Sequence, residues 1–413
     1  MSLPIPAPPR AKKIPQRIEQ LGRVRVDDYA WMKDDNWQAV LRDPSVVKAD
    51  VREHLEAENA YTEAVLAGTI DLQAALFAEM KGRIKEDDAS VPVPHGPYEY
   101  YARFELGSQH PIHARRRREA DAAEEILLDE EAASKGKAYY KVGGAGHSPD
   151  HRLYAWAVDE QGSEFYRLFV RDIASGAMLG APIESAYGDF TFSPCSRFLF
   201  WVWRDENARP ARVYRRAVGG DADVLVYEEP DDGLFLGVGR TSDDAFVTIR
   251  ASNHEISEYR VLPASTPDGE FVVAASRDEA LDYSLDHWTD RWVIRTDADG
   301  SVDFKICESD APVPTRDTWR DLVPHQPGRF ITGFDLTAGH LSRAERADAN
   351  DRIVVRTRAG DEHPIAFDEP AFSLHMDGGL DYETTTLRFT YQSPTTPRQT
   401  FDYDLVSRDR TLR

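Results

Sequence analysis

The sequence from Ser193 to Trp203 reads Ser-Pro-Cys-Ser-Arg-Phe-Leu-Phe-Trp-Val-Trp, a turn followed by a short apolar strand. Serine and proline favour the turn, and aromatic and β-branched residues favour the strand. The apolar run from Phe198 to Trp203 is far shorter than the roughly 20 residues that a membrane span needs. The stretch therefore predicts one strand of a β-rich folded domain.

Similar strand starts recur along the chain at a nearly constant interval. The aromatic or aliphatic residues that open them are Leu153, Phe198, Phe246, Trp292 and Phe330, with less regular copies at Tyr98 and Leu387. The five regular starts are 45, 48, 46 and 38 residues apart. A period of roughly 40–50 residues holding about four strands is typical of a propeller blade. We therefore expect a mainly β chain that forms a seven-bladed β-propeller.

The strands are separated by turn signals rather than by long helices. These signals include Ser148-Pro149-Asp150, Ser175-Gly176, Gly219-Gly220, Asp299-Gly300 and Ala359-Gly360. A pair of β-sandwiches uses strands of similar length, but a period that recurs across the middle of the chain argues against it. The polar stretch from Leu341 to Arg352 is expected to form a single helical turn.

The N-terminal part of the chain has a different pattern. Between Asn36 and Lys85, apolar residues recur near the helical period of 3.6, with a break at Gly68-Thr69. This pattern predicts two helices joined by a short turn. We therefore assign residues 1–85 to an extended and helical segment and residues 86–413 to the propeller.

Composition excludes several classes of function. The formal net charge of −22 would repel phosphates, so a nucleic-acid partner is not expected, whereas basic ligands would be attracted. The stretch Met1–Pro15 lacks the apolar core of a secretory signal, and no membrane partner is expected. Two isolated thiols, Cys195 and Cys307, indicate no disulfide framework. A cytoplasmic location is therefore expected.

Motifs for chemistry are weak throughout the chain. The segment Gly146–Asp150 resembles a nucleophile elbow but ends in Asp, and Ser148 is better explained as a turn residue. His110 and His113 are separated by Pro111, which disfavours the helix that would bring them together on a metal. His287 and His375 stand alone in the sequence, and Val142–Gly146 lacks the Lys-Ser/Thr of a phosphate loop. No catalytic, cofactor-binding or metal-binding residue is therefore assigned, and no cofactor is expected.

Two carbohydrate-related functions were weighed against structural explanations. Adjacent carboxylates such as Asp27-Asp28 and Asp231-Asp232 could serve a glycosidase, but they lie mostly beside turns, where charge is usually solvated. Aromatic residues in or beside strands could stack on sugars, but packing between blades explains most of them. They are Tyr154, Trp156, Tyr166, Trp201, Trp203, Trp288 and Trp292.

Several segments resemble the prolyl oligopeptidase family of serine peptidases, and in particular its oligopeptidase B branch, also called protease II. The segments are Gly22–Met32, Glu56–Asn59 with Tyr61, Glu79–Glu86 with Val91-Pro92, Val226–Asp231, Tyr283–His287, Ile365–Pro370 and Tyr391–Pro397. Each is modest alone, but their order and spacing from about Pro9 to the last residue are specific.

The resemblance implies a two-domain enzyme. In that family a helical N-terminal segment packs on a C-terminal α/β-hydrolase domain, and a seven-bladed propeller restricts access to its Ser-His-Asp triad. Oligopeptidase B cleaves short peptides after Arg or Lys by acyl transfer. The family's triad lies beyond the position that matches Arg413, so none of its members is carried over to this sequence.

Two hypotheses follow from the resemblance and the charge. In the first, the chain is the gating and substrate-filtering part of an oligopeptidase, with short basic peptides as substrates of the full-length enzyme, and is inactive alone. In the second, a stand-alone propeller binds basic peptides or a protein partner. The first hypothesis also predicts that the apolar face of residues 36–85 covers the hydrolase domain and is unstable without it.

Overall fold

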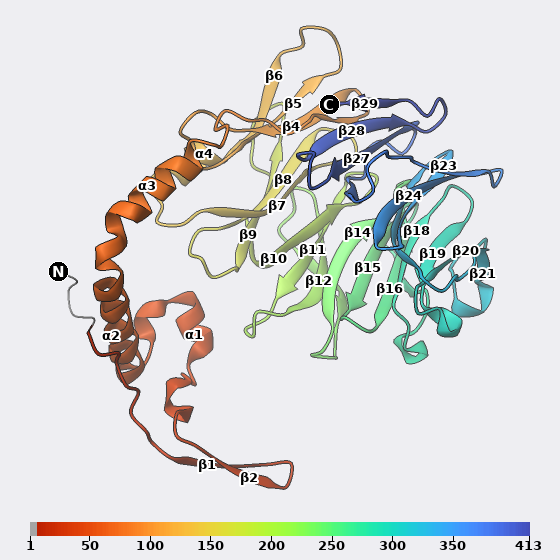
Figure 1. Cartoon of the computed structure of the whole chain (residues 1–413). Helices are drawn as coiled ribbons and strands as arrows, with labels where there is room; N and C mark the ends of the chain where they lie inside the picture. The colour runs from red at the N-terminus through yellow and green to blue at the C-terminus, as the bar shows by residue number, and fades with distance from the viewer. Residues whose placement is uncertain (1–5) are drawn as a thin grey trace. The chain divides into compact units, whose positions relative to one another are not determined.

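The computed structural model describes residues 6–413 (Figure 1). Residues 1–5, which belong to the predicted segment 1–85, lie outside the described residues. The chain divides into two compact units. Unit 1 is Met1–Asp88 together with Gln161–Ser163, and unit 2 is Ala89–Glu160 together with Glu164–Arg413.

Unit 1 begins with a β-hairpin. Strands β1 (Gln16–Gln20) and β2 (Arg23–Asp27) pair antiparallel, with Gln20 opposite Arg23. The two turn residues, Leu21 and Gly22, both have positive φ, of 52° and 69°. Two consecutive positive φ values give the turn a twist that matches the right-handed twist of the strands.

Helices form most of the rest of unit 1, as the helical period predicts. The longer ones are α2 (Ala49–Leu66) and α3 (Ile70–Lys81), and the short 3₁₀ turn η3 (Ala67–Thr69) separates them at the predicted break. The remaining elements are η1 (Ala30–Met32), α1 (Trp37–Arg42) and η2 (Pro44–Val46). Among the described residues, no helix combines the length and apolar character needed to cross a membrane.

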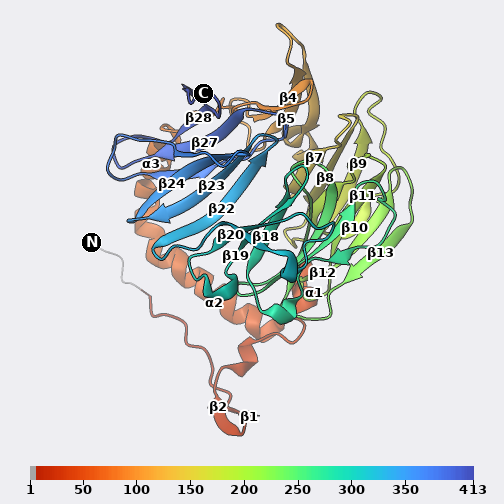
Figure 2. The same cartoon turned by 90° about the vertical axis from the view of Figure 1, so that its right-hand side faces the viewer.

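Unit 2 consists of antiparallel sheets whose strands follow one another in sequence (Figures 1 and 2). Five of these sheets have four strands each. They are β3 (Val93–His95), β4 (Tyr98–Arg103), β5 (Ile112–Arg117) and β6 (Glu124–Asp129); β14 (Phe235–Arg240), β15 (Phe246–Ser252), β16 (Ser257–Pro263) and β17 (Val272–Val273); β18 (Tyr283–His287), β19 (Trp292–Thr296), β20 (Lys305–Ser309) and β21 (Arg320–Val323); β22 (Arg329–Thr337), β23 (His340–Ala347), β24 (Asn350–Thr357) and β25 (Glu362–Pro364); and β26 (Ser373–Met376), β27 (Thr386–Gln392), β28 (Gln399–Asp404) and β29 (Arg410–Leu412).

The sixth sheet is continuous over seven strands. Its members are β7 (Lys141–His147), β8 (Leu153–Asp159), β9 (Tyr166–Asp172), β10 (Ile183–Phe192), β11 (Phe198–Arg204), β12 (Pro210–Ala217) and β13 (Asp223–Glu228). Short helical elements connect some strands of unit 2: α4 (Glu130–Ser134), η4 (Arg277–Glu279), η5 (Ala298–Gly300) and η6 (Arg316–Thr318).

The prediction of a seven-bladed propeller is wrong, because residues 6–413 form only five separate four-stranded blades. Two of the predicted repeats, those opening at Leu153 and Phe198, merge into the seven-stranded sheet. The long strand β10 causes this merger: it pairs with β9 up to Ala186 and with β11 from Ala186 onward. Its register shifts on both sides, so one strand serves two neighbours.

Phe330, one of the predicted strand starts, also occupies a different position within its sheet from Phe246 and Trp292. Phe246 and Trp292 open the second strand of their sheets, whereas Phe330 lies on β22, the first strand of its sheet. The matching second strand is β23, which contains Leu341. The stretch predicted to be a helical turn, Leu341–Arg352, is instead part of the hairpin of β23 and β24, because its backbone pairs antiparallel across the turn, with Ala347 opposite Asn350.

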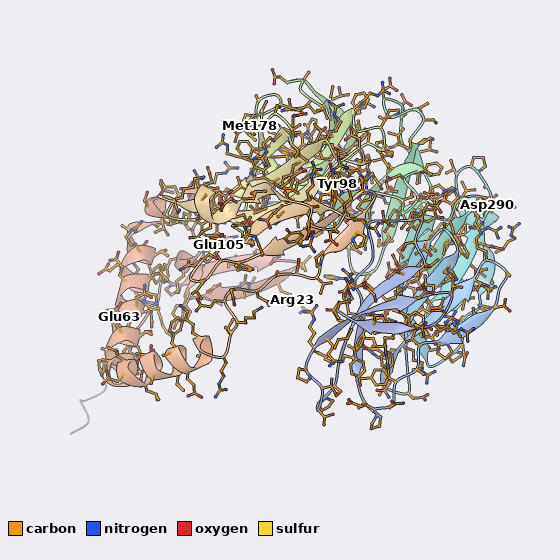
Figure 3. The ribbon with its side chains drawn as sticks, turned by 90° about the horizontal axis from the view of Figure 1, so that it is seen from above. Arg23, Glu63, Tyr98, Glu105, Met178 and Asp290 are labelled. Atoms are coloured by element: carbon orange, nitrogen blue, oxygen red, sulfur yellow. The ribbon has the colours of Figure 1, made fainter. Side chains whose placement is uncertain are left out.

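The core of unit 2 lies between neighbouring sheets. One apolar cluster joins Phe200 and Val202 of the seven-stranded sheet to Leu236 and Val238 of β14. The tryptophans predicted to pack between blades include several that are at most 9% exposed: Trp156, Trp201, Trp288 and Trp292. Figure 3 shows Tyr98 among the strands, whereas Met178 and Asp290 lie toward the periphery.

Side chains rather than a shared strand join the first and last blades. The sheets β3–β6 and β26–β29 lie side by side in both views (Figures 1 and 2). Arg388 of β27 donates to the carbonyl of Pro92 at 2.8 Å and forms a two-point ion pair with Asp402, at 2.7 and 2.9 Å. Asp381 accepts the backbone N–H of Gly96 at 2.7 Å.

Replacing Arg388 should weaken this junction. Because the side chain is only 10% exposed and its bonds are charge-assisted, Arg388→Ala should lower the free energy of unfolding by about 2–3 kcal/mol, measured in urea. Arg413→Ala is the matched control, because Arg413 also pairs with Asp402 but is 43% exposed. It should change stability by no more than about 0.5 kcal/mol. Equal effects of the two substitutions would contradict a closing role for Arg388.

Candidate functional site

A cavity of about 810 Å³ lies within unit 2. Its walls come from the first blade, from the seven-stranded sheet, and from Arg240 at the end of β14 and Leu380 in the loop before β27. Both polar and apolar groups line it, and its volume falls in the range of ligand-binding sites. It is therefore the candidate functional site of the described residues.

Glycines in β7 allow one wall of this cavity to form. An ideal Cβ placed on Gly144 would lie 2.3 Å from the carbonyl oxygen of Gly188 in β10, and one on Gly143 would lie 2.4 Å from the ring of Tyr166. The register of β7 against β8 shifts at this point. Gly144 therefore allows close backbone packing of β7 on β10, and Gly143 leaves room for the ring of Tyr166 on β9.

Charged groups of both signs face the cavity. Arg204 donates to the carbonyl of Ala208 at 2.8 Å and pairs with Glu164 at 3.1 Å. Arg240 lies 3.2 Å from a carboxylate oxygen of Asp244, and its burial lowers the pKa of its guanidinium.

A buried carboxylate completes the charged lining of the cavity. Asp189 accepts the N–H of Val238 at 3.1 Å, and burial raises the pKa of this carboxyl. The cavity therefore offers both donors and acceptors to a peptide-like ligand.

Three histidines gather beside the cavity, and two of them line it. His95 ends β3, His147 ends β7, and His151 lies in the turn between β7 and β8. Nδ1 of His95 lies 2.7 Å from Nε2 of His147, and the hydroxyl of Tyr100 lies 2.8 Å from Nδ1 of His151. One nitrogen from each ring can be chosen so that all three lie within 4.8 Å of one another.

Burial governs the protonation of this histidine cluster. It lowers the pKa of His95, of His147 (to about 2) and of His151, and repulsion by neighbouring histidine rings lowers the pKa of His147 and His151 further. Burial raises the pKa of Tyr100 to about 12. All four groups are therefore uncharged near neutral pH.

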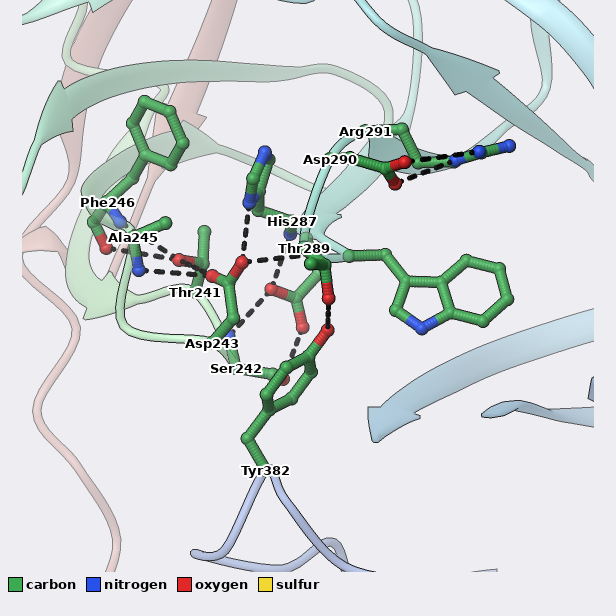
Figure 4. Close-up of polar contacts among 12 residues, drawn as sticks. Thr241, Ser242, Asp243, Ala245, Phe246, His287, Thr289, Asp290, Arg291 and Tyr382 are labelled. Atoms are coloured by element: carbon green, nitrogen blue, oxygen red, sulfur yellow. Dashed lines mark hydrogen bonds and ion pairs between the residues drawn. The ribbon is translucent and has the colours of Figure 1, made fainter. Parts of the chain in front are cut away.

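A second polar cluster joins the loops of three other blades (Figure 4). Nδ1 of His287 lies 2.6 Å from a carboxylate oxygen of Asp243, as in the His–Asp half of a catalytic triad. The neighbouring hydroxyls are used elsewhere, because Ser242 donates to Asp286 and Thr289 pairs with Tyr382. The imidazole of His287 packs on Phe246 and Trp292 at 4.9 Å. This cluster therefore ties loops together.

The histidines and the serine that the sequence offered as candidate site residues lie apart from one another in the structure. His113 lies 2.6 Å from Glu130, whereas the ring of His110 meets Tyr140 edge-on. Ser148 is buried, donates to Asp150 at 2.5 Å and accepts the N–H of Leu153, so its interpretation as a turn residue is confirmed.

The histidine cluster was missed because two sheets assemble it. His147 and His151 are four residues apart, a spacing that brings side chains together in a helix but here spans a turn. Only the packing of the first blade against the seven-stranded sheet brings His95 beside them.

Known proteins resemble this chain in sequence. The family model described as "Prolyl oligopeptidase, N-terminal beta-propeller domain" matches residues 9–413. Dipeptidyl aminopeptidase BI of Pseudoxanthomonas mexicana is 36% identical over 422 residues, covering 98% of this chain and 57% of the relative. Protease 2 of Moraxella lacunata is 26% identical, covering 99% and 58%. The chain therefore spans less than two thirds of the length of these relatives.

Solved structures agree with the sequence comparison. Oligopeptidase B from Leishmania major has a TM-score of 0.89 at 27% identity, covering 98% of this chain and 60% of that one. Oligopeptidase B from Trypanosoma brucei, solved with covalently bound antipain in a closed form, has a TM-score of 0.87 at 26% identity with the same coverage.

The glycine wall can be tested with two substitutions on one strand. Gly144→Ala should lower the free energy of unfolding by about 1–3 kcal/mol, because the added methyl meets backbone that cannot move freely. Gly146→Ala is the control, since an added Cβ there has no heavy atom within 4 Å. Urea unfolding of both variants would measure the difference. A tolerated Gly144→Ala would show that β7 and β10 can separate.

Proposed function

Because the chain belongs to the prolyl oligopeptidase family, as its N-terminal β-propeller domain, we propose that it filters substrate for a serine oligopeptidase that cleaves short peptides after Arg or Lys. In this proposal the Ser-His-Asp triad lies in a C-terminal α/β-hydrolase domain of the full-length protein, and the present chain contributes none of its three members. The match over residues 9–413 carries the proposal.

The cavity supports a filtering role. At about 810 Å³ it has room for a short extended peptide but none for a folded domain. Its wall is rigid, because β7 and β10 make backbone contacts too close for any side chain at Gly144. A rigid wall discriminates by size, since a larger substrate would have to separate packed sheets.

Charge supports basic peptides as the substrates. A net charge of −22 attracts cations over the Debye length and raises their rate of encounter. The cavity itself carries Arg204 and Arg240 beside Glu164 and Asp189, so it shows no strong preference of its own. We therefore assign selection for Arg or Lys to the catalytic domain and only electrostatic attraction to this chain.

The N-terminal helices support a catalytic partner domain. Apolar side chains of α3 are left exposed: Ile70, Leu72, Leu76, Phe77 and Met80. Such a set on one short helix is typical of a surface that another domain covers. The α/β-hydrolase domain of the full-length protein is the proposed occupant.

A second candidate activity comes from one relative. The protein that is 36% identical is named a dipeptidyl aminopeptidase, and the candidate is therefore release of dipeptides from free N-termini. Such an enzyme must bind an α-ammonium group, for which Glu164 and Asp189 are the cavity carboxylates available.

Two matched substrates separate the candidate activities. The full-length protein should cleave a fluorogenic Arg-Arg amide whose N-terminus is blocked, and a serine-directed inhibitor should abolish turnover. A dipeptidyl aminopeptidase would instead require the free N-terminus and lose most of its kcat/KM with the blocked substrate. Cleavage after residues other than Arg or Lys would refute the proposed specificity.

The 413-residue chain alone serves as the second arm of this experiment. It should show no turnover of either amide, and inhibitor-sensitive turnover by it would refute the placement of the triad. Binding of an Arg-rich peptide by the chain without any full-length peptidase activity would instead favour the stand-alone binding module. That binding should be strongest at low salt.

A further inference from the structure

We propose that His95, His147 and His151 form a binding site for a transition-metal cation of the zinc class. The three rings are the one group of at least three metal-ligating side chains found among residues 6–413 with ligand atoms so close together. None of the comparisons assigns a metal to this domain. The site stands apart from peptide cleavage and does not rest on the proposed function.

The ring nitrogens are already near the positions that a metal requires. Zinc–imidazole bonds of about 2.0–2.1 Å place the ligand nitrogens of a tetrahedral site roughly 3.3 Å apart. Nδ1 of His95 and Nε2 of His147 are 2.7 Å apart, and the third ligand nitrogen lies within 4.8 Å of both. Small rotations of the rings bridge the difference. On binding, the proton held between the first two nitrogens moves, through water, to the other nitrogen of its own ring, so that all three ligands remain neutral imidazoles.

The ligand type selects the class of cation. All three donors are imidazole nitrogens, which suit Zn²⁺, Co²⁺, Ni²⁺ and Cu²⁺, whereas Mg²⁺ and Ca²⁺ prefer oxygen ligands. His95 and His147 line the 810 Å³ cavity, so a fourth position can be filled by water or a ligand atom from that space. Three histidines with one open position are a common zinc arrangement.

Neighbouring groups hold the rings in place. The hydroxyl of Tyr100 lies 2.8 Å from Nδ1 of His151, which leaves Nε2 of that ring for the metal. The ring of Tyr100 also stacks on His147, with centroids 3.7 Å apart and planes 7° apart. Arg115 donates to the carbonyl of His151 and fixes the backbone of the turn.

The charges around the site are mixed. Asp381 lies near His95 and His151 and favours a cation, while Arg240 and Arg115 oppose one. Asp381 is held at the site by the N–H of Gly96, at 2.7 Å. The three direct metal–nitrogen bonds outweigh this near-balanced background, as in other sites built from neutral imidazoles.

A bound metal would connect two sheets. His95 belongs to the first blade, whereas His147 and His151 belong to the seven-stranded sheet and its turn. A cation that binds only the folded protein stabilises it in proportion to the logarithm of its concentration above Kd. Metal loading should therefore raise the Tm of the protein by several degrees.

Cobalt provides a direct readout. The full-length protein, prepared without a histidine tag and stripped with a chelator, is titrated with Co²⁺ while visible absorption is recorded. We expect the intense d–d bands of a tetrahedral Co²⁺ site with nitrogen ligands, at one equivalent, and their loss on addition of Zn²⁺. An unchanged spectrum of hexa-aqua Co²⁺ up to millimolar concentration would overturn the proposal.

Variants identify the ligands. His95→Gln, His147→Gln and His151→Gln should each weaken Co²⁺ binding at least tenfold, whereas His254→Gln, at an exposed turn, should not change it. Tyr100→Phe keeps the stacked ring and removes the hydroxyl, so binding should weaken about 10–100-fold while the metal-free Tm changes little. Binding that survives all three histidine substitutions would place the cation elsewhere and refute the site. If a histidine variant fails to fold, the Tyr100→Phe result decides.

Discussion

The sheets of this protein depend on one another because an isolated four-stranded sheet leaves both apolar faces in water. Each sheet of unit 2 buries its faces against the next, as Phe200 and Val202 do against Leu236 and Val238. At about 25 cal/mol per Å² of apolar surface, this burial between sheets is the main stabilising contribution. Every other feature, from the cavity to the histidine cluster, relies on sheets held in this order.

A chain of stacked sheets has two ends that must also be covered. Here no strand is exchanged between the first and last sheets, so Arg388, Asp402 and Asp381 make the junction with residues 92–96. Side-chain bonds of this kind are individually weaker than a shared strand. They can open without breaking a ladder of backbone hydrogen bonds, which is compatible with the substrate-filtering role proposed above.

One wall of the cavity forms where β7 packs too closely on its neighbours to leave room for side chains. β7 approaches β10 so closely that only glycine fits at position 144, and the ring of Tyr166 on β9 leaves room only for glycine at position 143. The register of both β7 and β10 is irregular in this region. Strand β7 ends in His147, which places an imidazole at the rim. The wall and the histidine cluster are therefore consequences of one irregular strand.

The sequence alone determined the β-rich class, the helical N-terminal segment and the resemblance to the family, because period, turn residues and local motifs are properties of neighbouring residues. It also identified Ser148 as a turn residue rather than a nucleophile. It did not determine the number of separate blades, since the double pairing of β10 depends on partners on either side. Nor did it reveal the meeting of His95 with His147 and His151, because contacts between sheets are set only when the sheets stack.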